Sequence, residues 1–217
     1  MITQTALLSN QDACARANIY GFLAAVFSSH PSEASVESVR EMATALDIAW
    51  DDHRSLDELD AEYMALFVVP GRRYVAPYES VFRDRWQVPA ALRPGSNPSE
   101  ASITIKGLLM GESTLAVRDC YRRVGVSPTE ALPDHIANEL RFIAHLWSCE
   151  AETVGDDAVR YAELRVEFCT QHLLKWLRQL RERVLESGHR GCYTIALELA
   201  ERVLEDEYQT SQVSQDL

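Results

Sequence analysis

The 217 residues of the chain suffice for one substantial domain or two small ones, and 47% apolar with 25% charged residues is the composition of a water-soluble globular protein. The chain carries 33 acidic and 21 basic side chains, a formal net charge of −12. This balance argues against nucleic acid as a partner, because binding nucleic acid depends on neutralising phosphates. It favours a cationic partner, unless the acidity serves only to keep the protein in solution.

Apolar residues recur at helical spacing along most of the chain, while strand-like alternation is scarce. The pattern predicts an all-α fold, a bundle of about seven or more helices. The predicted helices are Gln11–Phe27, Ser32–Leu46, Leu56–Phe67, Gly111–Val124, Asp134–Ala151, Asp156–Glu186 and Tyr193–Tyr208. Leu46 and Leu115 are expected to face inward with the other apolar residues of their helices. The polar tail, 209–217, is expected to be flexible.

The stretch Glu58–Phe82 is the most informative part of the chain. Its first half is predicted to be helical, because four apolar residues at spacings of four, three and one share one face. They are Leu59, Tyr63, Leu66 and Phe67. Pro70 and Gly71 end this helix. The segment that follows, Val75–Phe82, is predicted to be a loop with more large apolar groups than a solvated loop carries. It is either tucked into a core or offered to a ligand.

Carboxylates crowd the start of the same helix, where they suit the positive end of the helix dipole. They are Asp57, Glu58, Asp60 and Glu62. Two interpretations stay open at this stage. The carboxylates form either a solvated first turn or a patch that binds arginines.

Two segments are predicted to lack regular structure. Proline and glycine interrupt the stretch Trp86–Lys106, which is predicted to be a long loop. Near residue 130, Pro128 suits the first turn of a helix, yet Pro133 follows almost at once. The predicted organisation is therefore an N-terminal helical half (1–126) that carries the Tyr63–Phe82 segment, a hinge loop (127–133), a C-terminal helical half (134–208) and the tail (209–217).

Asp134, His135 and Glu139 cluster at the start of a predicted helix, and the last two share one face. A metal site would need a third ligand, which His172 could supply only through the tertiary fold. A second interpretation is that Asp134 caps the helix and bonds to His135. A third is that both residues bind a ligand.

No catalytic constellation accompanies this cluster. The sequence has no G-x-S-x-G, no glycine-rich phosphate loop and no H-E-x-x-H. Ser80 follows Glu79, but a neighbouring carboxylate does not supply a base and an orienting group. These observations favour a binding protein over an enzyme, with no catalytic residue, no metal and no cofactor expected.

The cysteines predict a reducing compartment. Five are widely spaced without a C-x-x-C pair, which argues against a disulfide framework or a thiolate zinc site. Residues Met1–Asn10 lack the basic and apolar runs of a signal peptide. The longest nearly apolar stretch, Ile19–Phe27, is too short to span a bilayer. We therefore expect a cytoplasmic protein without stable membrane insertion.

Short motifs in a consistent order resemble those of the TorD/DmsD/NarJ-like family of cytoplasmic chaperones, which serve the maturation of molybdenum enzymes. Tyr63–Phe67 resembles the family's aromatic-x-x-Leu-Phe motif. Pro77–Phe82 resembles the Pro-aromatic-x-Ser segment that follows it. The resemblance spans most of the chain, and the order and spacing of the motifs carry it rather than any single motif.

The family's hinge motif, Glu-Pro-x-Asp-His, has a partial counterpart here. Asp134 and His135 match its last two positions. Ala131 and Leu132 stand where the family has glutamate and proline, and the proline falls one place later, at Pro133. The departure concerns the geometry of the hinge and any domain swapping more than the binding role.

The resemblance implies a chaperone that binds the leader peptide, twin-arginine in many members, and the apo form of a molybdopterin-dependent oxidoreductase catalytic subunit. It would hold back export or assembly until the molybdopterin cofactor is inserted. The peptide site carried over by position comprises Tyr63, Leu66, Phe67, Pro77, Tyr78, Glu79, Ser80, Asp134 and His135. The client enzyme stays open, as does the choice between monomer and homodimer. Some family members bind guanine nucleotides, but no feature of this chain independently supports that.

Within this implied site, we expect an apolar groove to supply most of the affinity, while Glu79 or Asp134 selects arginines. Two other functions remain alternatives. One is a helical adaptor that binds a different partner without leader specificity. The other is a metal-dependent helical enzyme that uses His135, Glu139 and His172.

Overall fold

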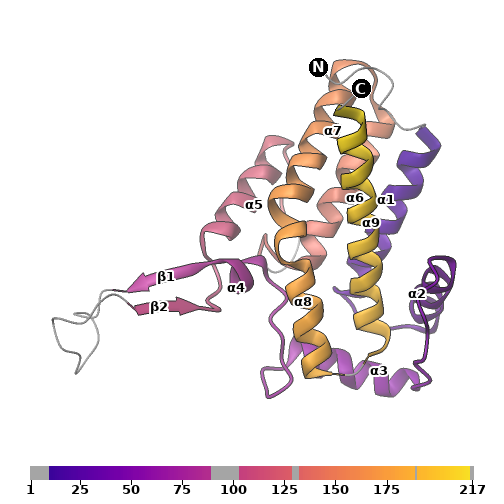
Figure 1. Cartoon of the computed structure of the whole chain (residues 1–217), viewed down its shortest axis with the longest axis vertical. Coiled ribbons are helices and arrows are strands. Elements are labelled where there is room, and N and C mark those ends of the chain that lie inside the picture. Colours follow the sequence, from indigo (N-terminus) through magenta and orange to yellow (C-terminus); the bar gives the residue numbers. More distant parts are fainter. Residues whose placement is uncertain (1–9, 89–102, 129–131, 189, 216–217) are drawn as a thin grey trace.

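The computed structural model describes residues 10–88, 103–128, 132–188 and 190–215 (Figure 1). Within them, long helices lie along the molecule, α3 crosses one end of the bundle, and a two-stranded hairpin projects from its side. The helices are α1 (Asn10–Val26), α2 (Glu33–Ala45), α3 (Leu56–Tyr63), α4 (Glu79–Arg83), α5 (Glu112–Arg123), α6 (Ile136–Glu152), α7 (Asp156–Phe168), α8 (Leu174–Ser187) and α9 (Cys192–Gln215). The strands are β1 (Arg85–Val88) and β2 (Ile103–Lys106). The all-α prediction is confirmed.

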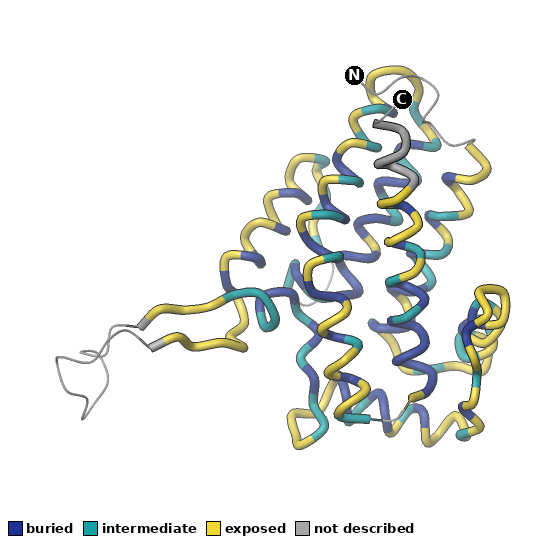
Figure 2. The backbone as a smooth tube through the Cα atoms, in the orientation of Figure 1, coloured by how far each residue is buried: buried dark blue, intermediate teal, exposed yellow. Residues whose placement is uncertain are grey.

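One hydrophobic core runs through the bundle and joins helices from both halves of the sequence (Figure 2). The contact of α1 with α6 lies at its centre. Small residues at three- and four-residue spacing let these helices approach closely; on α1 they are Ala13, Ala17, Gly21 and Ala24. Large side chains fill the remaining space, among them the fully buried Tyr20, Leu23, Ile143 and Trp147. Burying one such aliphatic side chain contributes about 1.5–3 kcal/mol.

Two predicted helices contain a π-helical turn that periodicity did not show. The helix predicted at Leu56–Phe67 becomes α3 followed by a π-turn at Met64–Val68. The helix predicted at Asp156–Glu186 becomes α7 and α8 with a π-turn at Cys169–Leu173 between them. Such turns add one residue per turn locally and often mark functional segments.

The predicted loop Trp86–Lys106 is wrong at both ends, where β1 and β2 pair antiparallel. The register places Arg85 opposite Lys106 and Trp86 opposite Ile105. Aromatic and β-branched residues in these short runs favour strands, although glycine and proline dominate the intervening sequence. The middle of the predicted loop, 89–102, lies outside the described residues.

Three further expectations need correction or stay open. Leu46 and Leu115 are exposed, because Leu46 lies beyond the last turn of α2 as its C-cap and Leu115 lies on the side of α5 away from the buried residues. The tail predicted to be flexible is helical as far as Gln215. The division into two halves with a hinge at 127–133 stays a prediction, and part of that hinge, 129–131, lies outside the described residues. Among the described helices, none is both long and apolar enough to cross a membrane.

Candidate functional site

The two motif segments, distant in sequence, meet at one antiparallel bridge between Tyr78 and His135. Two backbone hydrogen bonds of 2.9 Å make it, from the Ile136 N–H to the Pro77 carbonyl and from the Glu79 N–H to the Asp134 carbonyl. The same segment is tied to the π-turn that follows α3, because the Val75 N–H donates to the Leu66 carbonyl at 2.7 Å. The apolar loop predicted at Val75–Phe82 is therefore clamped between two helix ends. Its last residues form the short helix α4.

At the bridge, the half-buried rings of Tyr78 and His135 pack edge to face, with centroids 5.0 Å apart. His135 is the N-cap of α6, and its Nδ1 accepts a hydrogen bond from the Ala137 N–H at 3.2 Å. Burial lowers the pKa of His135 to about 4, so the imidazole is neutral at physiological pH and its Nδ1 stays free to accept.

The interpretation of Asp134 as the helix cap is wrong. The Asp134 carboxylate instead accepts a hydrogen bond from the Ser80 N–H, 3.0 Å from its Oδ2, at the start of α4. Asp134 and Ser80 are fully buried. A carboxylate in the first turn of a helix meets unpaired N–H groups there. Asp134 therefore holds α4 in place, and its burial keeps it from contacting a peptide at the surface.

Glu79 is also fully buried, although a loop carboxylate usually faces water. It forms an ion pair with Arg83 and accepts a hydrogen bond from His172 Nδ1 at 2.8 Å. Burial lowers the pKa of His172, but the hydrogen bonds to Cys120 and Glu79 outweigh burial and raise that pKa to about 9. A protonated His172 thus balances Glu79 inside the protein.

Glu139 completes this buried group. Its Oε2 accepts a hydrogen bond from Trp176 Nε1 at 3.1 Å. Burial and the neighbouring charge of Glu79 raise the pKa of Glu139 well above its ordinary value, which favours the protonated acid. The group links α4, α6 and α8 through charge and hydrogen bonds, and it presents no carboxylate to solvent.

The predicted metal ligands do not assemble. His172 pairs with Glu79, Glu139 bonds to Trp176, and His135 caps its own helix. Within the described residues, no group of three or more His, Cys, Asp or Glu side chains has the arrangement of a metal site.

Tyr63 and Phe67 belong to a separate aromatic cluster around Tyr193 of α9, with ring centroids 5.9 and 5.5 Å from it. Both side chains are at least nine-tenths buried, at 6% and 9% exposure, and Leu66 is covered completely. A cavity of about 180 Å³ lies beside the cluster and is lined by residues that include His30 and Tyr193. Tyr63, Leu66 and Phe67 therefore do not line the cavity. Tyr63 and Phe67 pack behind Tyr193, which does.

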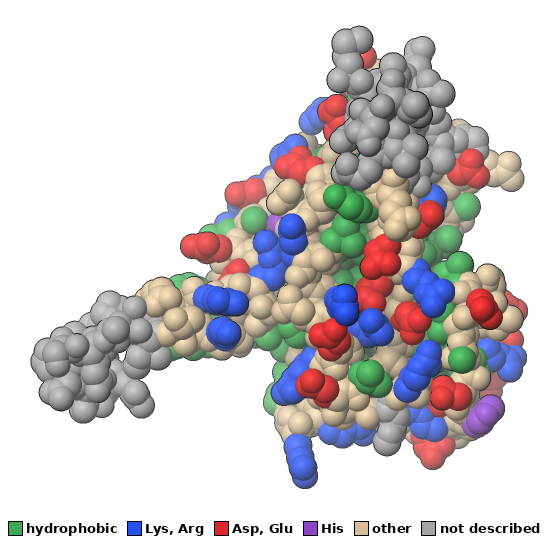
Figure 3. All heavy atoms as spheres, viewed as in Figure 1, with side chains coloured by type: hydrophobic (Ala, Val, Ile, Leu, Met, Phe, Trp, Pro, Cys, Tyr) green, Lys and Arg blue, Asp and Glu red, His purple; other side chains and the backbone are tan. Residues whose placement is uncertain are grey.

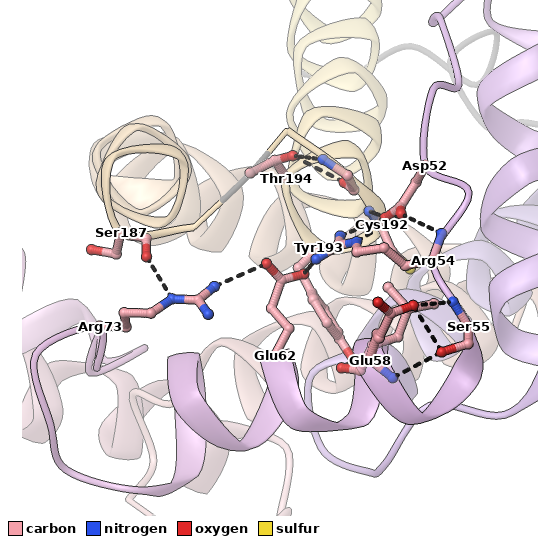
Figure 4. Close-up of polar contacts among 12 residues, drawn as sticks. Asp52, Arg54, Ser55, Glu58, Glu62, Arg73, Ser187, Cys192, Tyr193 and Thr194 are labelled. Carbon is pink, nitrogen blue, oxygen red and sulfur yellow. Dashed lines mark hydrogen bonds and ion pairs between the residues drawn. The ribbon is translucent and has the colours of Figure 1, made fainter.

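Two of the α3 carboxylates, Glu58 and Glu62, are engaged within the protein (Figure 4). Glu62 is buried and pairs with Arg54 at 2.7 Å and with Arg73 at 3.1 Å. Arg73 also donates to the Ser187 carbonyl at the end of α8. Glu58 caps the helix with Ser55. Glu62 therefore serves to join α3 to the α8 end, and it is not offered to external arginines.

A second cavity, of about 220 Å³, opens beside the predicted hinge. Its lining is mainly apolar and comprises Tyr121, Val126, Ser127, Pro128, Asn138, Arg141, Phe142 and His145. The Tyr121 hydroxyl donates to the Pro133 carbonyl at 2.9 Å, and the Asn138 amide donates to the Leu132 carbonyl at 3.0 Å. The cavity is linked to the bridge through Asn138, whose N–H donates to the His135 carbonyl at 2.9 Å.

Sequence reasoning missed the residues of α6 that line this cavity. Their signal was present, because Asn138, Arg141, Phe142 and His145 follow a spacing of three, four and seven from the first and so share one face. That face mixes polar and aromatic side chains. It does not stand out from an ordinary half-exposed helix until α5 and residues 126–128 enclose it.

Comparison with known proteins agrees with the resemblance. Residues 31–182 match the sequence model of the nitrate reductase delta subunit family. The Chaperone protein TorD of Vibrio cholerae serotype O1 is 29% identical over 167 residues, which cover 75% of this chain and 66% of that protein, just under two thirds of its length. The Chaperone protein TorD of Colwellia psychrerythraea is 25% identical over 227 residues, covering 90% and 91%. These relatives are named as chaperones rather than enzymes.

Among solved structures, a putative redox enzyme maturation protein from Archaeoglobus fulgidus aligns with 91% of this chain and 93% of its own. The TM-score is 0.44 and the sequence identity is 17%.

Proposed function

Because the chain belongs to the nitrate reductase delta subunit family, we propose that it is a maturation chaperone for a molybdenum oxidoreductase and binds the leader peptide of that client. In this role it would act in the cytoplasm on the apo form of the catalytic subunit. It would delay export or assembly until the molybdopterin cofactor is in place. Family membership supports the chaperone role. The binding of a leader peptide and the delay of export or assembly are the more specific parts of the proposal.

The observation that carries the proposal is the Tyr78–His135 bridge beside the cavity lined by Asn138 and Phe142. Two motif segments converge there, and the half-buried rings of Tyr78 and His135 pack against each other. A flexible leader peptide has an apolar segment that is not packed against the rest of the leader. A preformed, mainly apolar cavity suits such a segment.

The burial of Glu79 and Asp134 changes which residues we expect to contact the peptide. Glu79 and Asp134 are fully covered and already have partners, so we no longer assign them direct contact with the arginines of a leader. Their role in binding is to hold the Tyr78 segment in place. Contact with the peptide falls to Tyr78, His135 and the cavity.

Magnitudes favour apolar contacts as the source of affinity. Burying about 300 Å² of an apolar segment contributes roughly 7 kcal/mol at about 25 cal/mol per Å². Ordering a flexible leader costs about 2–5 kcal/mol. An exposed arginine–carboxylate pair contributes only about 0–1 kcal/mol. The net result is modest affinity, suited to a chaperone that must release its client.

The test is titration calorimetry of the full chain with a panel of twin-arginine leader peptides, each paired with a version whose apolar segment is replaced by serine and a version whose two arginines are replaced by alanine. We expect one leader to bind, with a larger loss for the serine version than for the alanine version. Binding of none would contradict leader recognition and favour the adaptor. A greater loss for the alanine version would contradict the apolar site.

A further inference from the structure

The hairpin and the segment that follows it carry a concentration of exposed apolar side chains. We call the described residues Arg85–Val88 and Ile103–Met110 the arm. Trp86 on β1 is 45% exposed, and Met110 at the end of the arm is 66% exposed. The remaining exposed apolar residues of this region are Ile105, Leu108, Leu109 and, on α5, Leu115. Single exposed apolar residues are ordinary, but five within the arm and a sixth on the adjoining helix are typical of an interaction surface.

The register gives the arm two different faces. Residues directly opposite each other in an antiparallel pair lie on the same face, and neighbours along a strand alternate. Trp86 and Ile105 therefore share an apolar face, while Arg85 and Lys106 share the other. Two cations directly opposite each other repel. Both cations are exposed, so this face can receive carboxylates. Figure 3 shows cationic side chains on the arm.

The sheet of the arm is also incomplete. In the described part of the chain it has only two strands, and such a hairpin is marginally stable in water. Alternate residues on each outer edge direct N–H and C=O groups away from the partner strand, which makes an edge a template for a further strand. Charged residues beside an edge discourage indiscriminate pairing, so a matching strand must bring the opposite charge.

The base of the arm is fixed to the body, so the two faces have a defined direction. Asp84, directly before β1, accepts hydrogen bonds from the N–H and the hydroxyl of Ser113 in the first turn of α5, at 3.0 and 2.6 Å. Gly111 permits this contact, since a Cβ there would lie 1.9 Å from the Asp84 carboxylate. The arm is therefore anchored at its base while its apolar and cationic faces stay uncovered.

We propose that the arm binds an extended segment of the client polypeptide, outside its leader, as an added β-strand. In that strand, alternate apolar side chains pack on Trp86 and Ile105, and the carboxylates between them meet Arg85 and Lys106. The identification of the occupant as a client rests on the proposed chaperone function. The site itself is distinct from the Tyr78–His135 bridge and takes the opposite charge: acidic here, whereas a twin-arginine leader is basic.

The test uses a blocked ten-residue peptide of alternating valine and glutamate and its valine–lysine counterpart, titrated into the full chain by calorimetry. We expect the glutamate peptide to bind and the lysine peptide not to bind. The double variant Arg85→Glu with Lys106→Glu should weaken the glutamate peptide at least tenfold and gain binding of the lysine peptide. Lys175→Glu, an exposed cation on α8, is the matched control and should change neither.

Strand addition has its own readout. Two versions of the glutamate peptide carry N-methyl groups, one at odd and one at even backbone positions, so each cannot donate hydrogen bonds along one of its edges. At least one of these two registers should lose binding. Undiminished binding by both N-methylated registers would overturn strand addition, and an unchanged affinity in the double variant would overturn the charge assignment. Failure of both unmodified peptides to bind would overturn the proposal.

Self-association is the remaining outcome. If sedimentation shows dimers that Trp86→Ser dissociates while Leu185→Ser, an equally exposed control on α8, does not, the arm is an interface between copies and the proposal is wrong. The leader titrations are independent of these results. A protein that binds leaders normally with Trp86→Ser but ignores the glutamate peptide would retain the proposed function and lose only this inference.

Discussion

The ring of Tyr78 lies 5.0 Å from that of His135, centroid to centroid, at the bridge that joins the end of the α3 region to the start of α6. These two rings are the half-buried members of a predicted site whose other residues are mostly covered. The arrangement separates two roles that the sequence could not separate. In the proposed function the rings contact the peptide, while Glu79 and Asp134, both buried, hold the segment that carries them.

Replacing Tyr78 with alanine should weaken leader binding about tenfold, because the loss of one half-buried aromatic contact is worth about 1.4 kcal/mol. The measurement is calorimetry with the leader that binds the wild-type chain. Tyr208→Ala is the control, since Tyr208 is exposed on α9 and should leave the affinity unchanged. Equal affinity of the Tyr78 variant would remove the bridge from the binding site.

Glu79→Gln should lower the free energy of unfolding by roughly 1–3 kcal/mol, because it leaves His172 and Arg83 without the charge they face. Urea denaturation at neutral pH measures the change. Glu37→Gln breaks an exposed pair with Arg40 and should cost no more than about 1 kcal/mol. In folded protein, the Glu79 variant should bind the leader better than Tyr78→Ala does. The opposite order would restore Glu79 as a direct contact.

The stability of the protein should fall as the pH rises from about 7 to about 9. The pKa of His172 is raised to about 9 in the folded protein, so the folded state holds a proton that the unfolded state releases near the ordinary pKa of about 6.5. The stabilisation is complete below that ordinary pKa and is lost as the pH passes the raised one. Urea midpoints across this range should fall less steeply for His172→Asn than for the wild type. Parallel curves would show that His172 does not hold the extra proton.

His135 predicts an effect on the acid side. Burial lowers its pKa to about 4, so between about pH 6.5 and pH 4 the unfolded state binds a proton that the folded state excludes. Stability should therefore fall as the pH is lowered through this window. His135→Asn keeps a side chain able to cap α6 but cannot titrate, and it should remove part of that decline. If the variant and the wild type decline alike, buried carboxylates alone account for acid unfolding.

Gly111→Ala should lower the free energy of unfolding by about 1–3 kcal/mol, because the added Cβ would collide with the Asp84 carboxylate and displace it from α5. Gly71→Ala is the control, since the nearest atom to a Cβ there is 3.8 Å away. Urea denaturation measures both. The double variant with Asp84→Ala should lose less than the sum of the two single changes, because both act on the same contact. Additive losses of unfolding free energy would mean that Gly111→Ala acts on a contact other than the one with Asp84.

The sequence by itself determined the helices of the bundle and the residues that fill its core. In α1, Ala13, Ala17, Tyr20 and Ala24 recur at spacings of three and four, which predicts that they share one face, and all four are buried. Helical periodicity is a local property, so a single chain displays it without knowledge of its neighbours. The absence of catalytic motifs is equally local information, and it favours a binding protein.

The tertiary structure alone decided which site residues face solvent. Glu79 and Asp134 belong to a polar-looking loop, and their burial depends on partners such as His172, which is 93 positions away from Glu79. A carboxylate becomes stable inside a protein only when distant chain segments supply charge and hydrogen bonds to it. The hairpin could not be predicted from the sequence for a related reason. The pairing of Trp86 with Ile105 is a contact between remote residues, whereas the sequence displays only local preference.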